Sequence, residues 1–364
     1  MILHRYFARR FTYSFLGVFG IFFAMLASLD LIDQVRRFGA AGATLGELVG
    51  LTFLNVPQAI YRIMPLIMII ASIALFLALA RSSEMVVTRA AGRSALRALW
   101  APVIVALIIG CLAVGLFNPI VAATSKQYEA RAGALTGQSS VLALSGSGIW
   151  LRQGNAQGQT VIRAEQANLD GTVLTRVTFL NFAPDGTPSQ RIEAASATLD
   201  AGAWTLRDAK VWLLDGIRNP EAEAVTSVMY NVPSTLTPDQ IRDSFGTPAS
   251  IPIWELPRFI DRLQAAGFTA RRHQVFFQVE LASPLFLIAM VLIAAGFTLR
   301  HQRGGRTGVM VLAAILVSFG IYFLRNFAQI LGETGQIPAI LAAWAPPLAA
   351  IGMSMGLLLH MEDG

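Results

Sequence analysis

Residues 63–80 read IMPLIMIIASIALFLALA, a run with no charged side chain. A helix that crosses the hydrocarbon core of a bilayer needs about 20 mostly apolar residues, and this run comes close to that length. Comparable uncharged runs lie before and after a long polar region, at 11–29, 98–125, 281–299, 307–324 and 334–360. Three runs, a polar region and three more runs predict a membrane α-helical bundle of six transmembrane helices with an inserted domain.

The composition excludes an ordinary soluble protein. Of the 364 residues, 54% are hydrophobic and 14% are charged, whereas soluble domains carry roughly a quarter charged residues. The first uncharged run is long enough to span a bilayer, and the SLDLIDQV that follows it (28–35) lacks a small-x-small cleavage site. We therefore expect a membrane span there and not a cleaved signal peptide.

The positive charges orient these spans. Arginine is concentrated before the first span and in the segments 81–97 and 300–306, while the segments 30–62 and 325–333 are balanced and are expected to be loops. Short cytoplasmic loops of membrane proteins carry an excess of Lys and Arg. This predicts cytoplasmic N- and C-termini and an outer position for 126–280. Because the net charge of +6 then belongs mostly to cytoplasmic loops, it does not indicate nucleic-acid binding.

The long polar region has the features of a β domain. Segments that alternate apolar and polar residues, or are rich in β-branched ones, are separated by turn sequences such as NLDG, PDG and AG. Several short strands with regular turns predict a sandwich or partial barrel. We expect an all-β domain over 126–252, with Trp150, Phe179, Trp204 and Trp212 in its core.

The stretch IWELPRFIDRLQAAG (253–267) has apolar residues at spacings of three and four. This spacing predicts an amphipathic helix within a connecting segment 253–270. The remaining boundaries follow from the spans, with transmembrane helices one to three in 1–125 and helices four to six in 271–364.

The segment between the second and third spans, RSSEMVVTRAAGRS (81–94), indicates a short cytoplasmic helix over 82–92. Its serines can cap the start, Glu84 lies in the first turn where the helix dipole favours an acid, and Gly92 can end it. So short a helix is not stable unaided and needs a partner on which to dock. The alternative is a solvated cytoplasmic loop that merely follows the charge rule.

No motif of a catalytic or metal site is found in the sequence. It has no GxxxxGK[ST] phosphate loop and no HExxH, CxxC or GxSxG, and its four histidines are scattered at the ends of spans. No charge lies near the centre of a predicted span, which argues against an ion-coupled transporter. We therefore expect a non-catalytic chain with no metal site and no cofactor of its own.

The segment 81–94 resembles the cytoplasmic coupling helix of the lipopolysaccharide-export permeases, the LptF/LptG family of ABC transporter subunits. Other stretches resemble the same family along nearly the whole chain: HRYFARRF (4–11), LIDQVRRFG (31–39), ASPLFLIAMVLIAAGF (282–297) and GIYFLRNFAQILGETGQIPAILAAWAPP (320–347). The stretches more similar to the LptG type are LIDQVRRFG, GIWLRQG (148–154) and STLTPDQI (234–241).

The resemblance implies a function and a set of partners. The family extracts lipopolysaccharide from the inner membrane of Gram-negative bacteria and passes it to a periplasmic bridge toward the outer membrane. The implied partners are an LptB-type ATPase dimer that uses ATP and Mg, a second permease of the LptF type, and LptC and LptA-type periplasmic jellyroll proteins. The family's outer domain is a β-jellyroll, so the inserted domain is expected to be jellyroll-like and periplasmic.

Two groups of candidate functional residues follow from this resemblance. Contact with the ATPase is expected from the 82–92 helix, at Glu84, Met85, Arg89, Ala90 and Gly92. Binding of lipid A phosphates at the outer mouths of the spans is expected from Arg36, Arg37, Arg131, Arg271 and Arg272, because a guanidinium can bond two phosphate oxygens at once. Generic anchoring at the membrane interface is the alternative for these arginines.

Other classes of function remain open at this point. A membrane-anchored periplasmic assembly scaffold without transport activity would show the same spans and β domain. Permeases of the lipoprotein-release type usually have four spans, which disfavours them. A membrane enzyme that acts on lipid would need a polar catalytic cluster near the bilayer surface, and none stands out in the sequence.

Overall fold

The computed structural model describes residues 2–39, 42–82, 84, 95–136, 142–145, 148–155, 158–168, 171–200, 202–214, 219–234, 236–237, 241, 248–265, 269–298 and 307–362. The chain divides into two compact units. The helical unit consists of Met1–Thr136, Pro248–Leu256 and Arg271–Gly364, and the second unit consists of Gly137–Thr247 and Pro257–Ala270. Each unit is described by itself.

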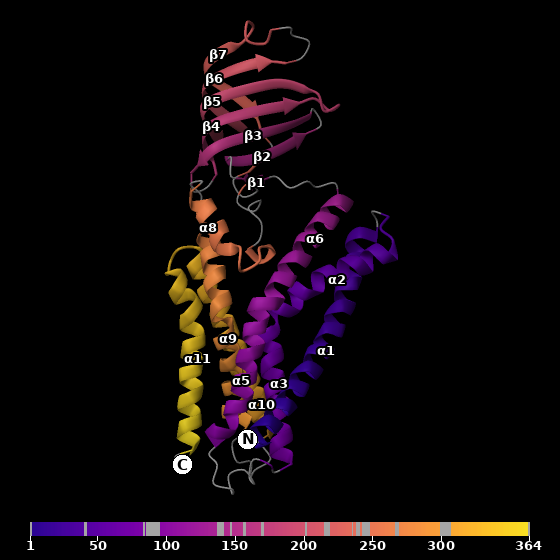
Figure 1. Cartoon of the computed structure of the whole chain (residues 1–364), viewed down its shortest axis with the longest axis vertical. Helices are drawn as coiled ribbons and strands as arrows, with labels where there is room; N and C mark the ends of the chain where they lie inside the picture. Colours follow the sequence, from indigo (N-terminus) through magenta and orange to yellow (C-terminus); the bar gives the residue numbers. More distant parts are fainter. Residues whose placement is uncertain are drawn as a thin grey trace. The chain divides into compact units, whose positions relative to one another are not determined.

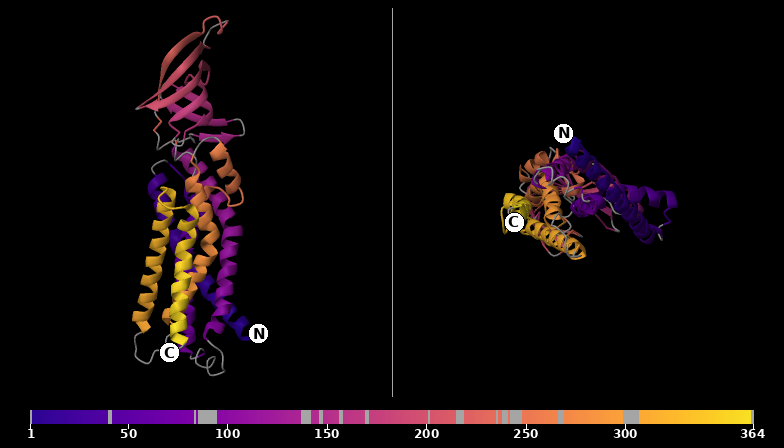
Figure 2. Two further views of the ribbon diagram at one scale, coloured as in Figure 1. Left: turned by 90° about the vertical axis from the view of Figure 1, so that its left-hand side faces the viewer. Right: turned by 90° about the horizontal axis from the view of Figure 1, so that it is seen from below.

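The helical unit contains long helices that run side by side, with both chain termini at the same end (Figures 1 and 2). Its elements are α1 (Ile2–Phe38), α2 (Leu45–Arg62), α3 (Met64–Arg81), α5 (Ala95–Leu112), the π-helical turn η2 (Ala113–Phe117), α6 (Asn118–Thr136), the short 3-10 helix η3 (Pro248–Ser250), α9 (Arg271–Thr298), α10 (Thr307–Glu333) and α11 (Ala339–Glu362). Within the described residues, six stretches are long and apolar enough to cross a membrane: Leu3–Phe38, Met64–Arg81, Leu99–Leu135, Arg271–Thr298, Gly308–Glu333 and Ala339–His360. The prediction of six membrane helices is confirmed.

The expected loop over 30–62 is wrong, because most of it is helical. α1 continues to Phe38, and α2 begins after Thr44 with a reciprocal capping box. The Thr44 backbone N–H donates to Glu47 Oε2 at 2.8 Å, and Thr44 Oγ1 accepts from the Glu47 backbone N–H at 3.4 Å. α2 then buries one apolar face, which includes Leu48 and Leu51. The T-x-x-E sequence was a readable start signal for this helix.

The helix α9 is the centre of the bundle. It packs against α3, α5, α10 and α11, and 72% of its apolar window is buried, compared with 6% for α1 and 11% for α10. Small residues allow the close approaches: a Cβ built on Gly110 of α5 would lie 2.6 Å from Pro284 Cα of α9. α1 and α10 each expose several large apolar side chains, among them Leu16 and Phe323.

The second unit contains a seven-stranded antiparallel sheet whose neighbouring strands are consecutive in the chain (Figure 1). The strands are β1 (Leu142–Ser145), β2 (Gly148–Asn155), β3 (Gly158–Ala167), β4 (Val173–Phe182), β5 (Pro188–Asp200), β6 (Ala203–Leu213) and β7 (Val225–Pro233). The sequences NLDG, PDG and AG fall between consecutive strands from β3 to β6, although Leu169, Asp170 and Ala201 lie outside the described residues. The inserted all-β domain is confirmed. The order of the described strands is that of a simple meander.

One face of this sheet forms a small core. Phe179 and Trp204 are fully buried, and their rings meet edge to face with centroids 6.2 Å apart. The core prediction is wrong for Trp150, which is exposed under the Arg163 guanidinium, and for Trp212, which lies on the outer face against Arg191 and Lys210. Strand alternation explains the difference, because the side chain of every second residue points away from the core.

The predicted amphipathic helix forms as α8 (Leu256–Ala265), three residues later than its pattern suggested. Pro257 occupies its first turn, where a missing backbone N–H has no cost. The helix buries Leu256, Ile260 and Leu263 on one side.

The contact between α5 and α9 makes Gly110 sensitive to any side chain. We expect Gly110→Ala to destabilise the chain by about 1–3 kcal/mol, because the added methyl group would overlap the Pro284 backbone. The matched control is Gly352→Ala in α11, where nothing lies within 4 Å of the added atom. Thermal unfolding in detergent measures both variants, and equal melting temperatures would contradict the close packing.

Candidate functional site

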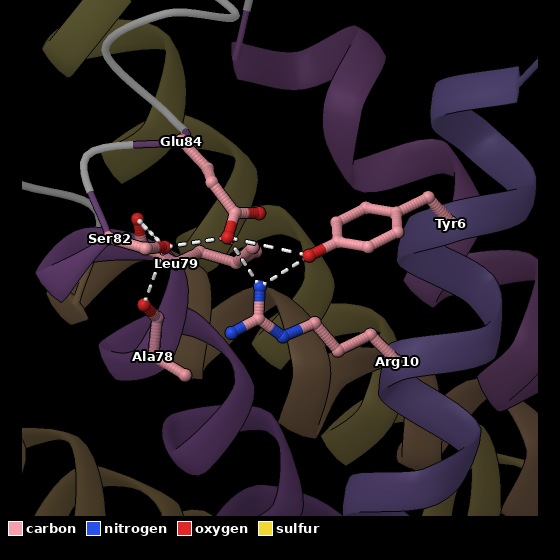
Figure 3. Close-up of polar contacts among 6 residues, drawn as sticks. All are labelled: Tyr6, Arg10, Ala78, Leu79, Ser82 and Glu84. Carbon is pink, nitrogen blue, oxygen red and sulfur yellow. Dashed lines mark hydrogen bonds and ion pairs between the residues drawn. The ribbon is translucent and has the colours of Figure 1, made fainter.

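The Glu84 carboxylate lies just past the end of α3 and is bonded to both α3 and α1 (Figure 3). Arg10 Nη1 of α1 lies 2.6 Å from Glu84 Oε1, and the Tyr6 hydroxyl lies 3.4 Å from the same oxygen. Arg10 Nη1 also donates to the Tyr6 hydroxyl at 2.8 Å. Tyr6, Arg10 and Glu84 thus form a connected polar group at the end of the bundle where the chain begins.

The local structure explains this group. Tyr6 and Arg10 are four residues apart on α1 and therefore share a face. On the other side, the Ser82 hydroxyl lies 2.9 Å from the Ala78 carbonyl oxygen and 2.7 Å from Glu84 Oε1, and its one proton serves one of them at a time. The end of α3 and the start of α1 are consequently joined through a single carboxylate.

The Glu84 carboxylate is held in its charged form. Burial alone would raise its pKa, but hydrogen bonds from Ser82 and Arg10, the Arg10 charge and the Tyr6 hydroxyl outweigh burial and lower the pKa below the ordinary value of 4.5. The side chains of Arg10 and Glu84 are 32% and 30% exposed. A carboxylate that is ionised, oriented and still open to solvent can bind a further cationic or hydrogen-bond donor group.

The rest of the predicted coupling helix cannot be placed, because Met85, Arg89, Ala90 and Gly92 lie outside the described residues. The structure adds two residues that the sequence reasoning did not select, Tyr6 and Arg10. In the sequence Arg10 served only as one of several topology-setting charges. A Tyr and an Arg four residues apart in HRYFARRF were a visible signal, but nothing in the sequence gave them a partner.

Three of the five predicted substrate-binding arginines lie in one corner of the bundle. Arg36 and Arg37 lie in the last turn of α1 and are exposed. Arg37 forms an ion pair with Asp33 at 2.8 Å. Arg131 of α6 is exposed, and its guanidinium lies over Gly50 of α2. The ends of α1, α2 and α6 pack together there through a small apolar cluster.

The other two arginines begin α9. Arg271 binds backbone carbonyls at the end of α10 and in the turn beyond it: Gly332 at 2.9 Å, Ile337 at 3.1 Å and Gly335 at 3.3 Å. These contacts add hydrogen bonds to carbonyls at and beyond a helix end, and they occupy most of the donors of the guanidinium. Arg272, the next residue, is exposed. The structure therefore does not bring all five arginines into one cluster.

Among the residues that the structure describes, no group of three or more His, Cys, Asp or Glu side chains could hold a metal ion.

The sequence matches a known family over nearly its whole length. The model of the family described as "Lipopolysaccharide export system permease LptF/LptG" covers residues 5–360. The chain belongs to the LptF/LptG family of permeases.

Curated relatives of this LptF/LptG-family chain are permease proteins named LptG. The lipopolysaccharide export system permease protein LptG of Haemophilus influenzae is 25% identical over 95% of this chain and 97% of its own length. The LptG protein of Escherichia coli K12 is 23% identical over 99% of this chain and 98% of its own length. These names agree with the resemblance to the LptG type in the stretches quoted above.

The Arg10–Glu84 contact should show in the pH dependence of stability of this permease. Because the pKa of Glu84 is lowered, the stabilisation from its charge is fully present above pH 4.5 and is lost as the pH falls through the lowered pKa. We expect Arg10→Gln to reduce stability by about 0.2–1 kcal/mol, equally from pH 5 to pH 8, and by less at lower pH.

Thermal unfolding of the two proteins in detergent measures this difference. The matched control is Arg5→Gln, which removes the same charge from an exposed position on the same helix. If Arg5→Gln and Arg10→Gln lowered stability equally, the effect would come from general charge and not from the Glu84 contact.

Proposed function

We propose that this chain is the LptG-type permease subunit of an ABC transporter that extracts lipopolysaccharide from the inner membrane and passes it to a periplasmic bridge toward the outer membrane. The observation that carries this proposal is the family match over residues 5–360, together with the oriented carboxylate of Glu84 in the first turn of the predicted coupling helix. The six candidate membrane helices and the separate sheet fit a permease with an outer domain.

The driving reaction belongs to another chain. The sequence has no phosphate-binding loop, so ATP and Mg would be used by an LptB-type ATPase dimer in the cytoplasm. The N- and C-termini, which lie at one end of the bundle (Figure 1), would then also be cytoplasmic, and the β domain periplasmic.

The Glu84 contacts suggest how force would enter the bundle. A displacement of the 82–92 segment would reach α3 through the chain itself and α1 through the bonds of Glu84 to Arg10 and Tyr6. The first half of α1 packs on the core of the bundle through Phe7, Phe11 and Phe15, so a displacement of its start would be passed on to the helices that it contacts. Met85, Arg89, Ala90 and Gly92 are proposed to complete the surface that docks on the ATPase.

Substrate binding is proposed at the corner formed by α1, α2 and α6. Arg36, Arg37 and Arg131 are exposed there at the ends of apolar helices, which suits a lipid with phosphates at headgroup level and acyl chains below. Arg272 is exposed on α9 and is a further candidate. Arg271 already binds three carbonyl oxygens, so it has less capacity for phosphate and its first role is to hold the end of α10.

Partner surfaces are proposed from the outward apolar faces. α1 and α10 would face the membrane and the LptF-type subunit, since both expose large apolar side chains such as Leu16 and Phe323. In the β unit, β7 pairs only with β6 among the described strands and exposes Val225 and Val228. An open strand edge can add a strand from another chain, as docking to LptC or LptA-type jellyrolls would require.

The second candidate function, a membrane-anchored assembly scaffold without transport activity, would use the same spans and sheet. It gives Glu84 no task beyond joining α1 to α3. The two functions therefore predict different results for the substitutions described next.

Reversing the charge at Glu84 tests the coupling role. We expect Glu84→Lys to lower lipopolysaccharide export by at least about tenfold in a complementation or release assay, with the chain still inserted in the membrane. The control is the swap Arg10→Glu with Glu84→Arg, which restores an ion pair within the chain. The swap should recover thermal stability but not export. Position 84 would still carry a positive charge, whereas the proposed ATPase partner binds a carboxylate there. Export restored by the swap would limit Glu84 to an internal contact.

Photocrosslinking tests the substrate corner. A photoreactive residue in place of Arg36, Arg37 or Arg131 should form adducts with lipopolysaccharide that change with ATP turnover in the reconstituted complex. The control position is Arg97, near the start of α5, where no ATP-dependent adduct is expected. Equal adduct formation at position 97 and at the three test positions would contradict a binding site at this corner.

A further inference from the structure

A buried carboxylate lies deep in the central helix α9. Glu280 is 4% exposed and is nine residues past the start of α9, roughly 14 Å along the helix axis. No charge was expected near the centre of a span; Glu280 lies in the first half of α9, within a helix whose predicted span began at residue 281. The uncharged run begins directly after Glu280, but the helix begins three turns earlier. An ionisable group at such a position is rare and points to a role beyond packing.

The Glu280 carboxylate is bonded to the junction of α2 and α3. The Tyr61 hydroxyl donates to Glu280 Oε2. Tyr61 lies one residue before the end of α2, and Ile63 alone separates α2 from α3. The Tyr61 ring also packs on Phe117 of η2, with centroids 5.8 Å apart.

The Asn118 side chain extends the contact into the third span. Its amide lies near the Tyr61 hydroxyl, and Asn118 follows the π-helical turn η2 directly. Single π-helical turns inside long helices disturb the regular backbone bonding and are frequent at functional sites. Here the disturbed backbone finds partners outside its own helix.

Those partners are in the segment Pro248–Leu256. The Ile253 backbone N–H donates to Asn118 Oδ1 at 3.0 Å, and the Trp254 indole N–H donates to the Gly115 carbonyl oxygen at 3.3 Å. Ile253 is 2% exposed. The segment is thus fixed to the π-helical turn by two bonds, one of which uses the amide that also faces Tyr61.

The outward helix α10 approaches the same carboxylate. Arg325 interacts electrostatically with Glu280 and Tyr61, and its guanidinium lies 5.0 Å from the centre of the Phe286 ring of α9. Tyr322, one turn earlier, donates to the Arg62 carbonyl oxygen at 3.4 Å. Contrary to the sequence reading, Arg325 does not follow the fifth span but lies within α10, eight residues before its end.

We propose that Glu280 is a positioning residue for export, which couples α10 to the segment Pro248–Leu256 through Tyr61 and Asn118. The proposal rests on the proposed function for its transport readout. The physical reason for coupling is that a buried polar group without a partner is costly. Movement of α10 would leave Glu280 without the nearby Arg325 charge, and movement of the segment would leave Asn118 Oδ1 without its Ile253 donor. The two movements therefore favour each other.

The substitutions Glu280→Gln and Tyr61→Phe test this network with little change in volume. Gln keeps an acceptor for the Tyr61 hydroxyl but removes the negative charge near Arg325, and Phe removes the hydroxyl that bonds to Glu280. The matched control is Ser283→Ala on the same helix, whose hydroxyl donates to the Val279 carbonyl of its own turn. The chain is studied in its complete transporter complex in nanodiscs, with Cys111→Ser as background because that native thiol is exposed.

Two readouts separate the network from the transport function. Spin labels at the exposed positions Glu255 and Phe327 report the distance between the segment and α10. We expect Glu280→Gln and Tyr61→Phe each to broaden this distance distribution and to lower lipopolysaccharide release at least about fivefold, with the double variant no worse than either single one. Ser283→Ala should change neither quantity.

Each result decides a separate point. A distance distribution unchanged by Glu280→Gln, or additive effects in the double variant, overturns the coupling. A broadened distribution with undiminished release overturns the role of Glu280 in export. Failure of the unsubstituted complex to release lipopolysaccharide would contradict the proposed function instead, and the distance measurement would still decide whether the network exists.

Discussion

A polar group inside a bilayer has no water to bond, and the arrangement of the helical unit follows from this constraint. In the six long apolar helices the backbone N–H and C=O groups bond to each other within each helix. Polar side chains inside these helices need hydrogen-bond partners from the protein. Glu280 meets this need with Tyr61 and the nearby Arg325, while Ser72, Thr298 and Ser354 bond to carbonyls of their own helices. Charged side chains that are not enclosed in this way, such as Arg36 and Arg37, lie exposed at helix ends.

The same constraint separates two kinds of polar site in this family member. At the end of the bundle that holds the termini, Glu84 is ionised, partly exposed and bonded to both α1 and α3, which suits contact with another protein. Within the bundle, Glu280 is enclosed by α2, α9 and α10 and suits the transmission of movement between them. α1 and α10 are the two spans whose apolar windows are least buried. α1 bonds to Glu84 through Arg10 and Tyr6, and Arg325 of α10 lies near Glu280.

The sequence was sufficient for the architecture because span length, charge bias and turn residues are local features. They predicted the six spans, the inserted all-β domain, the turns from β3 to β6 and the amphipathic helix α8. The sequence was insufficient where a helix continues past its apolar run. α1 extends through Asp30 to Phe38 and α9 begins nine residues before Glu280, so charges assigned to loops and mouths lie within helices.

The sequence also could not predict contacts between residues that lie far apart in the chain. Arg271 was selected as a cation for phosphate, but only the structure shows that three carbonyl oxygens around the end of α10 occupy it. Likewise, the sequence could identify Glu84 but not its bonds to Tyr6 and Arg10, seventy-eight and seventy-four positions away.

The central claim is that a separate ATPase subunit drives movement of this helical bundle by acting on the end that holds Glu84. The most direct measurement is gentle detergent purification of the tagged chain from its native membrane, followed by identification of its companions and assay of ATP hydrolysis. The account predicts recovery of a second six-span permease and an ABC-type ATPase, with ATP hydrolysis that vanadate inhibits. Recovery of the chain with periplasmic proteins alone, and without vanadate-sensitive ATP hydrolysis, would contradict it.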